Sequence, residues 1–217
     1  MNRKTSEMDE KAQALLQRAY SLKDSSQSQA LYASWAKTYD KTMLEGLGYL
    51  TPKNTAALLS KFVAAKQLRT LDVGSGTGLA GLELNALGFT HLDALDYSPQ
   101  MLAVAAHRGV YKNIIEADLN QMLDIPDDTY DAMICTGTFT HAHVSAKCLD
   151  ELFRILKPAG HFACTVHNDI WHTEGFEEKT TALSKTGLLK TVNQELGIYY
   201  ADSTTPEGWY IVWQKQG

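Results

Sequence analysis

Between residues 69 and 167, short apolar segments alternate with longer amphipathic ones. RTLDV (69–73) and HLDALD (91–96) have the length and apolar character of buried strands. SPQMLAVAAHRG (98–109) is typical of a helix, with Ser98 as N-cap and Gly109 at its end. The pattern also predicts strands at 111–118, 130–137 and 161–167, and helices at 77–88 and 146–160. This alternation predicts a parallel, doubly wound α/β sheet.

The C-terminal segment has a different pattern. GLLKTVNQELGIYY (187–200) and GWYIVWQK (208–215) resemble two strands, and the turn-rich ADSTTPEG (201–208) joins them. Two consecutive strands at the end of the chain predict an antiparallel hairpin at the sheet edge.

The N-terminal part is predicted to be helical. Apolar residues at positions 12, 15, 16 and 19 have helical spacing, residues 1–10 are expected to fray, and 22–29 is expected to be a linker. Within 30–50, an apolar face carries Leu31, Trp35, Tyr39 and Met43. Thr51 is the expected N-cap of the next helix, with proline at its first position.

Composition and charge narrow the possible classes of protein. The 217 residues are 44% apolar with a net charge of −5, and no block of Lys or Arg stands out. Double-stranded nucleic acid is therefore a poor expected partner. The three cysteines form no Cys-x-x-Cys motif, and the chain has neither an apolar run long enough to span a membrane nor a signal-peptide core. We expect reduced cysteines and a cytoplasmic protein; the sequence gives no indication of oligomeric state.

The glycine-rich stretch DVGSGTG (72–78) follows a predicted strand and precedes a predicted helix, which is the arrangement of a nucleotide-binding turn. A mononucleotide P-loop would need Lys-Ser/Thr after the last glycine, but Leu79 and Ala80 stand there. A dinucleotide site favours Gly-x-Gly-x-x-Gly, whereas this loop has Gly-x-Gly-x-Gly. S-adenosylmethionine is the third candidate cofactor.

Two acidic residues favour that third candidate. Asp72 lies close before the first glycine, where it would repel a diphosphate but attract the methionine ammonium and sulfonium. Asp96 ends the next predicted strand, twenty residues after Gly76. A carboxylate at that point can accept hydrogen bonds from both ribose hydroxyls.

Four motifs in this order resemble those of class I S-adenosylmethionine-dependent methyltransferases. They are LDVGSGTG, LDALDYSPQML, EADLNQMLDIPDDTYDAMICTGTFTH and LKPAGHFACTV, which together cover about residues 68–166. Any one of them alone is a weak signal, but four in register are strong. Ala159 stands where glycine is commoner in the family. YASWAKTYDKTM (32–43) further resembles the methyltransferase-like proteins of the Williams–Beuren region.

The resemblance implies a Rossmann-like seven-stranded sheet of order 3-2-1-4-5-7-6 with strand 7 antiparallel. It divides the chain into an N-terminal helical lid (1–50) and a methyltransferase domain (51–217). It also implies S-adenosylmethionine as cofactor and S-adenosylhomocysteine as product. The implied cofactor residues are Tyr32, Trp35, Tyr39, Asp72, Gly74, Ser75, Gly76, Gly78, Asp96, Tyr97, Met101, Asp118, Leu119 and Thr136.

Within that set, Asp72 is expected to bind the ammonium, directly or through water, and Asp96 the ribose. Tyr97 and Met101 would enclose the adenine, and Asp118 would accept from its amino group beside the Leu119 backbone. Ordinary core packing is the alternative for Met101, and a helix cap or a solvated turn is the alternative for Asp118.

The aromatic residues Tyr32, Trp35 and Tyr39 share one helical face. They are expected to form a lid and to stabilise the sulfonium by cation–π contact, or else simply to pack the helix onto the domain. Trp171 and His172 are acceptor-pocket candidates on position alone, and an ordinary loop is the alternative for both.

Candidate catalytic residues follow the fourth predicted strand. TGTFTH (136–141) lacks the Asn/Asp-Pro-Pro-Tyr of amino-methylating DNA enzymes, which argues against N-methylation of bases. His141 is the candidate general base, with His143 as a weaker one; a surface position, or no general base at all, is the alternative. The His-x-His pair has no evident third ligand, so no metal site is predicted.

We therefore expect methyl transfer to a small-molecule acceptor. The alternatives are a module that binds S-adenosylmethionine or S-adenosylhomocysteine without turnover, and a methyltransferase acting on protein or RNA.

Overall fold

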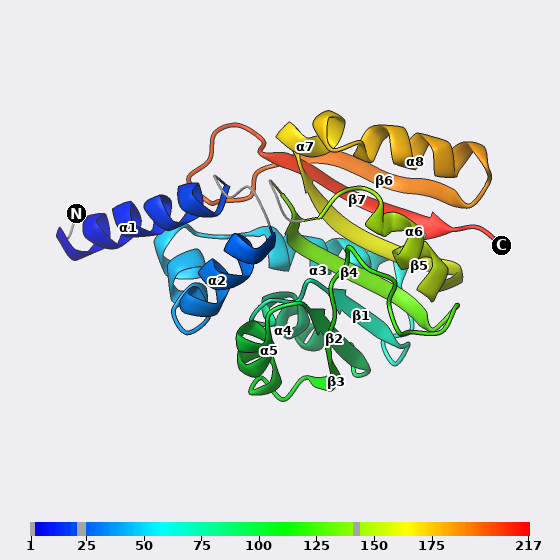
Figure 1. Ribbon diagram of the computed structural model, residues 1–217, viewed down its shortest axis with the longest axis horizontal. Coiled ribbons are helices and arrows are strands. Elements are labelled where there is room, and N and C mark those ends of the chain that lie inside the picture. Colours follow the sequence, from blue (N-terminus) through cyan, green and yellow to red (C-terminus); the bar gives the residue numbers. More distant parts are fainter. Residues whose placement is uncertain (1–2, 21–24, 141–143) are drawn as a thin grey trace.

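The computed structural model describes residues 3–20, 25–140 and 144–217, and it contains a seven-stranded sheet (Figure 1). The strand order is β3-β2-β1-β4-β5-β7-β6, and β7 runs antiparallel to both of its neighbours. The strands are β1 (Thr70–Val73), β2 (Leu92–Asp96), β3 (Tyr111–Glu116), β4 (Tyr130–Phe139), β5 (Leu156–His167), β6 (Leu189–Gly197) and β7 (Gly208–Lys215). This order confirms the predicted topology.

Helices cover both faces of the sheet (Figure 1). They are α1 (Arg3–Tyr20), α2 (Ser25–Trp35), the π-helix η1 (Lys41–Gly46), α3 (Thr51–Phe62), α4 (Leu79–Ala86), α5 (Pro99–Ala106), α6 (Cys148–Ile155), α7 (Asn168–Thr173) and α8 (Phe176–Lys185). In the part of the chain that the structure describes, no helix is both long and apolar enough to cross a membrane.

The core lies in two layers, one on each face of the sheet, because successive strand residues point to opposite faces. In β4, Met133 and Cys135 pack with α6, α7 and α8, while Ala132 and Ile134 pack with α3, α4 and the N-terminal segment. The N-terminal segment therefore contributes to the core of the sheet domain.

The N-terminal helices begin earlier than the apolar pattern predicts. Helix α1 starts at Arg3, so the expectation that residues 1–10 fray is wrong for Arg3–Glu10, and α2 starts at Ser25 within the predicted linker. Neither residues 3–10 nor residues 25–29 contain Gly or Pro, so nothing in these two segments interrupts a helix.

Two predicted boundaries also move. Thr51 is not an N-cap: it is the first residue of α3, and Leu50 precedes it without a side-chain cap. Strand β5 begins at Leu156, before the predicted His161, so the Lys-Pro-Ala-Gly turn belongs to the strand. Ala159 has a φ of 63°, a left-handed conformation that explains why glycine is commoner there.

Candidate functional site

The glycine-rich loop joins β1 to α4. Gly74, Gly76 and Gly78 have φ angles of 63°, 52° and 88°, which glycine adopts without steric cost. A Cβ on Gly74 would lie 2.1 Å from the Thr138 hydroxyl oxygen, whereas a Cβ on Gly76 would meet nothing within 4 Å. The loop thus packs against β4 at Gly74 and leaves open space beside Gly76.

Asp96 lies at the end of β2, and backbone N–H groups hold its carboxylate. Its Oδ2 accepts from the Gly76 nitrogen at 2.8 Å, and its Oδ1 accepts from the Ser98 nitrogen at 2.9 Å. Burial raises the pKa of Asp96, although these N–H groups act in the opposite direction. Each carboxylate oxygen has a further lone pair that can accept from a ligand.

Ser98 has the predicted capping role. Its hydroxyl oxygen accepts from the Met101 nitrogen at 3.4 Å at the start of α5, and Pro99 occupies the first helical position. The cap fixes the entry of α5 directly after Asp96, and it directs the buried Met101 toward the cavity described next.

A cavity of about 740 Å³, part of it open to solvent, lies against the loop and the end of β2. Ten predicted cofactor residues line it: Tyr32, Tyr39, Gly74, Gly76, Asp96, Tyr97, Met101, Asp118, Leu119 and Thr136. Six further lining residues are not in the predicted cofactor set: Leu95, Ala117, Asn120, Gly137, Thr138 and Val144.

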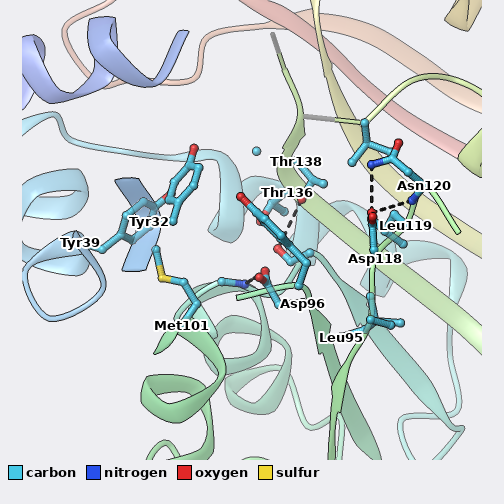
Figure 2. A pocket seen from close by; sticks show the side chains of 16 residues that line it. Tyr32, Tyr39, Leu95, Asp96, Met101, Asp118, Leu119, Asn120, Thr136 and Thr138 are labelled. Atoms are coloured by element: carbon cyan, nitrogen blue, oxygen red, sulfur yellow. Dashed lines mark hydrogen bonds between the residues drawn. The ribbon is translucent and has the colours of Figure 1, made fainter. Parts of the chain in front are cut away.

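Figure 2 shows how the cavity walls are arranged. Tyr32 and Tyr39 lie on one side, and Asp118 and Asn120 lie on the other, with Asp96 between them. Asp118 Oδ1 accepts from the backbone and side-chain nitrogens of Asn120 at 2.9 and 3.0 Å. Asp118 therefore forms a local turn as well as lining the cavity.

Four predicted cofactor residues do not line the cavity. They are Trp35, Asp72, Ser75 and Gly78. Asp72 lies within β1 and is 1% exposed, and its Oδ1 accepts no hydrogen bond from the described residues. The Ser75 hydroxyl is also buried without a partner in the described part of the chain.

Tyr111, at the start of β3, holds the Asp72 carboxylate. Its hydroxyl donates to Asp72 Oδ2 at 2.6 Å. Gly78 and Gly81 make room for the ring, because a Cβ on Gly81 would lie 2.1 Å from the Tyr111 oxygen. Burial raises the pKa of Asp72 to about 7, although the Tyr111 hydroxyl and the Gly81 N–H act to lower it. Glycines in and after the loop thus make room for the residue that bonds the buried Asp72 carboxyl, in addition to lining the cavity.

The N-terminal segment is attached to this loop through Asp40. Its Oδ1 accepts from the Thr77 hydroxyl at 2.5 Å, and its Oδ2 pairs with Arg108. The Arg108 Nε also donates to the Thr77 carbonyl at 3.1 Å. These contacts fix the position of Tyr39, whose ring meets the buried Trp35 edge-on at 4.9 Å between centroids.

The chain is similar in sequence to known methyltransferases. Residues 71–164 match the methyltransferase domain model. Human methyltransferase-like protein 27 is 29% identical over 181 residues, which are 81% of this chain and 73% of that protein. Together with the strand order, these matches support a class I S-adenosylmethionine-dependent methyltransferase that resembles the methyltransferase-like proteins.

A second relative in sequence matches over less than half of its own length, and a solved structure is similar in fold at low sequence identity. Demethylmenaquinone methyltransferase of Clavibacter sepedonicus is 36% identical over 94 residues, 42% of this chain and 38% of that enzyme. A chain solved in the complex with the Haloferax volcanii Trm112 methyltransferase activator superposes with a TM-score of 0.65 at 20% identity, covering 86% of this chain and 98% of that one.

The residues present fit the cofactor that this family implies. An apolar wall of Leu95, Met101 and Leu119 suits an adenine, and the buried Asp96 suits a ribose diol. The unpartnered oxygens of Asp72 and Ser75 beside the glycine loop suit an ammonium or a water bound to it. No cluster of metal-binding side chains occurs in the parts of the chain that the structure describes.

The structure tests the acceptor-pocket candidates but not the catalytic ones. His141 and His143 lie outside the described residues, so the assignment of His141 as general base stays a prediction. Trp171 is buried against Trp209, with 5.8 Å between centroids, and His172 is exposed and paired with Glu177. Neither Trp171 nor His172 lines the cavity.

Proposed function

We propose that this methyltransferase binds S-adenosylmethionine in the cavity at Asp96 and transfers the methyl group to a small molecule. The observation that carries this proposal is the buried Asp96 carboxylate, held by the Gly76 N–H at the edge of a largely apolar cavity. When bound, S-adenosylmethionine supplies an electrophilic methyl group, and S-adenosylhomocysteine is left after transfer.

In this proposal the residues divide between the parts of the cofactor. Asp96 accepts from the ribose hydroxyls, Tyr97 and Met101 enclose the adenine, and Asp118, with the Leu119 backbone, binds its amino edge. The methionine part contacts Gly74, Ser75, Gly76, Gly78 and Thr136. Asp72 balances the ammonium through its unpartnered oxygen, across water or directly.

We also propose that residues 1–50 act as a lid on the 51–217 domain. Tyr32 and Tyr39 line the cavity, and Trp35 packs behind Tyr39. An aromatic face beside the sulfonium would stabilise it by ~0.5–2 kcal/mol. A covered site and a net charge of −5 favour a small acceptor over nucleic acid or protein. The demethylmenaquinone methyltransferase among the relatives also acts, by its name, on a small molecule.

Two further expectations accompany the proposal. His141 follows the end of β4, where it would take a proton from the acceptor; His141→Ala should then lower the rate of methyl transfer more than it lowers cofactor affinity. The three cysteines are free and buried, as expected of a protein kept in the reducing cytoplasm.

Calorimetric titration with S-adenosylmethionine, S-adenosylhomocysteine and NAD tests the cofactor. We expect micromolar binding of the first two and none of NAD. Asp96→Ala should weaken S-adenosylhomocysteine binding about 100-fold, because two hydrogen bonds to a carboxylate are lost at ~1.5 kcal/mol each. Asp124→Ala, an exposed carboxylate that does not line the cavity, is the control.

Unchanged affinity in Asp96→Ala, or NAD binding as tight as that of S-adenosylhomocysteine, would overturn the assignment. Tight cofactor binding with no turnover of any acceptor would favour a binding module instead.

A further inference from the structure

A second, smaller cavity adjoins the proposed cofactor cavity. It encloses about 360 Å³, part of it open to solvent. Three separate parts of the chain line it. The N-terminal segment contributes Leu16, Tyr32, Trp35, Tyr39, Met43 and Tyr49, β4 and the residue after it contribute Gly137 and Thr140, and the β6–β7 connection contributes Tyr199 and Tyr200.

The two cavities meet at the carboxyl end of β4. Gly137, Tyr32 and Tyr39 line both of them. Gly137 has a φ of 72°, and a Cβ there would lie 2.5 Å from the Tyr49 hydroxyl oxygen. Because residue 137 is glycine, no side chain separates the two cavities at this point. A molecule in the second cavity would therefore lie next to one in the first.

Contacts between the three segments hold the aromatic walls in place. Tyr49 and Tyr200 form an isolated β-bridge, with their ring centroids 5.5 Å apart. The Leu50 nitrogen donates to the Tyr199 carbonyl at 2.8 Å. Trp35, Met43 and Tyr199 are each at most 3% exposed. The second cavity is thus built from packed side chains rather than from a surface hollow.

The chemistry of the walls selects the kind of molecule that would fit. Six of the described lining residues are aromatic and none is charged. A carboxylate or phosphate placed there would lose hydration without gaining a partner. A cationic acceptor would gain cation–π contact with the rings, but it would find no carboxylate and would face the positive sulfonium in the adjoining cavity. An uncharged ring can stack on the tyrosines and bond to their hydroxyls.

The size of the cavity points to one ring. The volume of about 360 Å³ includes open solvent and its enclosed part is much smaller, so one ring is the largest group that the packed walls would admit. We propose that the second cavity is the acceptor site, and that the acceptor is an uncharged molecule carrying one aromatic ring. This inference rests on the proposed function, and it replaces Trp171 and His172 as the acceptor-pocket candidates.

The first test is a titration with catechol, benzoate, benzylamine and cyclohexanol of the protein saturated with a nitrogen analogue of S-adenosylmethionine, which keeps the positive charge and transfers no methyl group. These probes share the size of one ring and differ in charge or aromaticity. We expect catechol to bind at least tenfold more tightly than any of the other three. Equal binding of benzoate, benzylamine or cyclohexanol would overturn the inference.

Variants locate the binding. Thr140 lines only the second cavity and is 6% exposed, so Thr140→Met should fill it and weaken catechol binding at least tenfold while S-adenosylhomocysteine affinity stays within twofold. Thr180, equally buried at 6% but in α8, provides the matched control Thr180→Met. Met43→Ala is an independent test, because the enlarged cavity should shift preference from catechol to 1-naphthol about fivefold.

Different results would overturn the proposed function and the acceptor site. No binding of S-adenosylhomocysteine would overturn the proposed function and this inference with it. Normal S-adenosylhomocysteine binding, with catechol binding that is absent or unaffected by both Thr140→Met and Met43→Ala, would overturn this inference alone.

Discussion

At the scale of single residues, the unusual group is the buried Asp72. Burial raises its pKa to about 7, and a hydroxyl from a distant strand opposes that rise. A carboxyl with such a pKa is mostly protonated at pH 6, and it would ionise when an ammonium is placed beside it. Cofactor binding would therefore be coupled to the loss of a proton from Asp72.

We expect the affinity for S-adenosylhomocysteine to rise about tenfold between pH 6 and pH 8, mostly below pH 7. Free Asp72 has a raised pKa and binds a proton in this range, whereas the complex needs the carboxylate, so binding releases a proton and higher pH favours it. Calorimetry at each pH, in two buffers of different ionisation enthalpy, measures both the affinity and the proton.

Two substitutions separate Asp72 from the nearby Asp96, whose pKa is also raised by burial. Asp72→Asn keeps an acceptor for Tyr111 and should flatten the profile. Tyr111→Phe removes a donor that stabilises the carboxylate, so the rise in affinity should move to higher pH. A profile in Asp72→Asn identical to that of the unchanged protein would contradict the assignment to Asp72.

Residues such as Tyr111 mark the limit of sequence analysis at this scale. Asp72, Asp96 and the loop glycines stand in a recognisable motif, and ten of the fourteen predicted cofactor residues line the cavity. Tyr111 reaches Asp72 from 39 positions away, and only the pairing of β2 with both β1 and β3 brings them together. Nothing in the local pattern around Tyr111 indicates a partner.

At the scale of elements, apolar runs and caps predicted every strand of the sheet and the helices between β1 and β5, but not α7 and α8, which lie between β5 and β6. The π-helix η1 was not predicted. Leu31, Trp35, Tyr39 and Met43 recur every four residues, and on an α-helix such a repeat drifts by about 40° at each step. The break at Ala36–Thr38 and the wider π-turns after it bring Met43 back to the buried face.

The Asp40 contacts join this irregular segment to the glycine loop, and they were also invisible to sequence patterns. We expect Asp40→Ala to speed amide hydrogen exchange at Trp35–Met43 about fivefold. The reason is that the pair with Arg108 and the hydrogen bond from Thr77 are partly buried and together contribute about 1 kcal/mol. Hydrogen exchange followed by mass spectrometry measures the effect.

Asp127→Ala is the control for that experiment. Asp127 also pairs with an arginine, Arg154, but its side chain is 73% exposed and lies far along the chain from the N-terminal segment. Exchange at Trp35–Met43 should not change in Asp127→Ala. Equal exchange in Asp40→Ala and the unchanged protein would show that Asp40 does not hold the segment.

At the scale of the whole molecule, the sheet and its N-terminal helices form two adjoining cavities with different dependence on α1. Among the residues of α1 whose side chains the structure describes, none lines the proposed cofactor cavity, whereas Leu16 lines the second one. Ala12 and Ala19 of the same helix are each 1% exposed. Helix α1 should therefore matter for the acceptor and for stability, and much less for the cofactor.

Removing residues 1–20 tests that division. We expect S-adenosylhomocysteine affinity within threefold of the full chain, catechol affinity about fivefold weaker, and a lower Tm, because apolar surface covered by α1 becomes exposed. Leu16→Ala in the full chain should reproduce the loss of catechol binding with a smaller change in Tm, since the rest of α1 still packs. Calorimetry and thermal unfolding measure all three. If removal of α1 abolished cofactor binding while Leu16→Ala left catechol binding intact, α1 would support the first cavity rather than the second, and its proposed role in acceptor binding would be wrong.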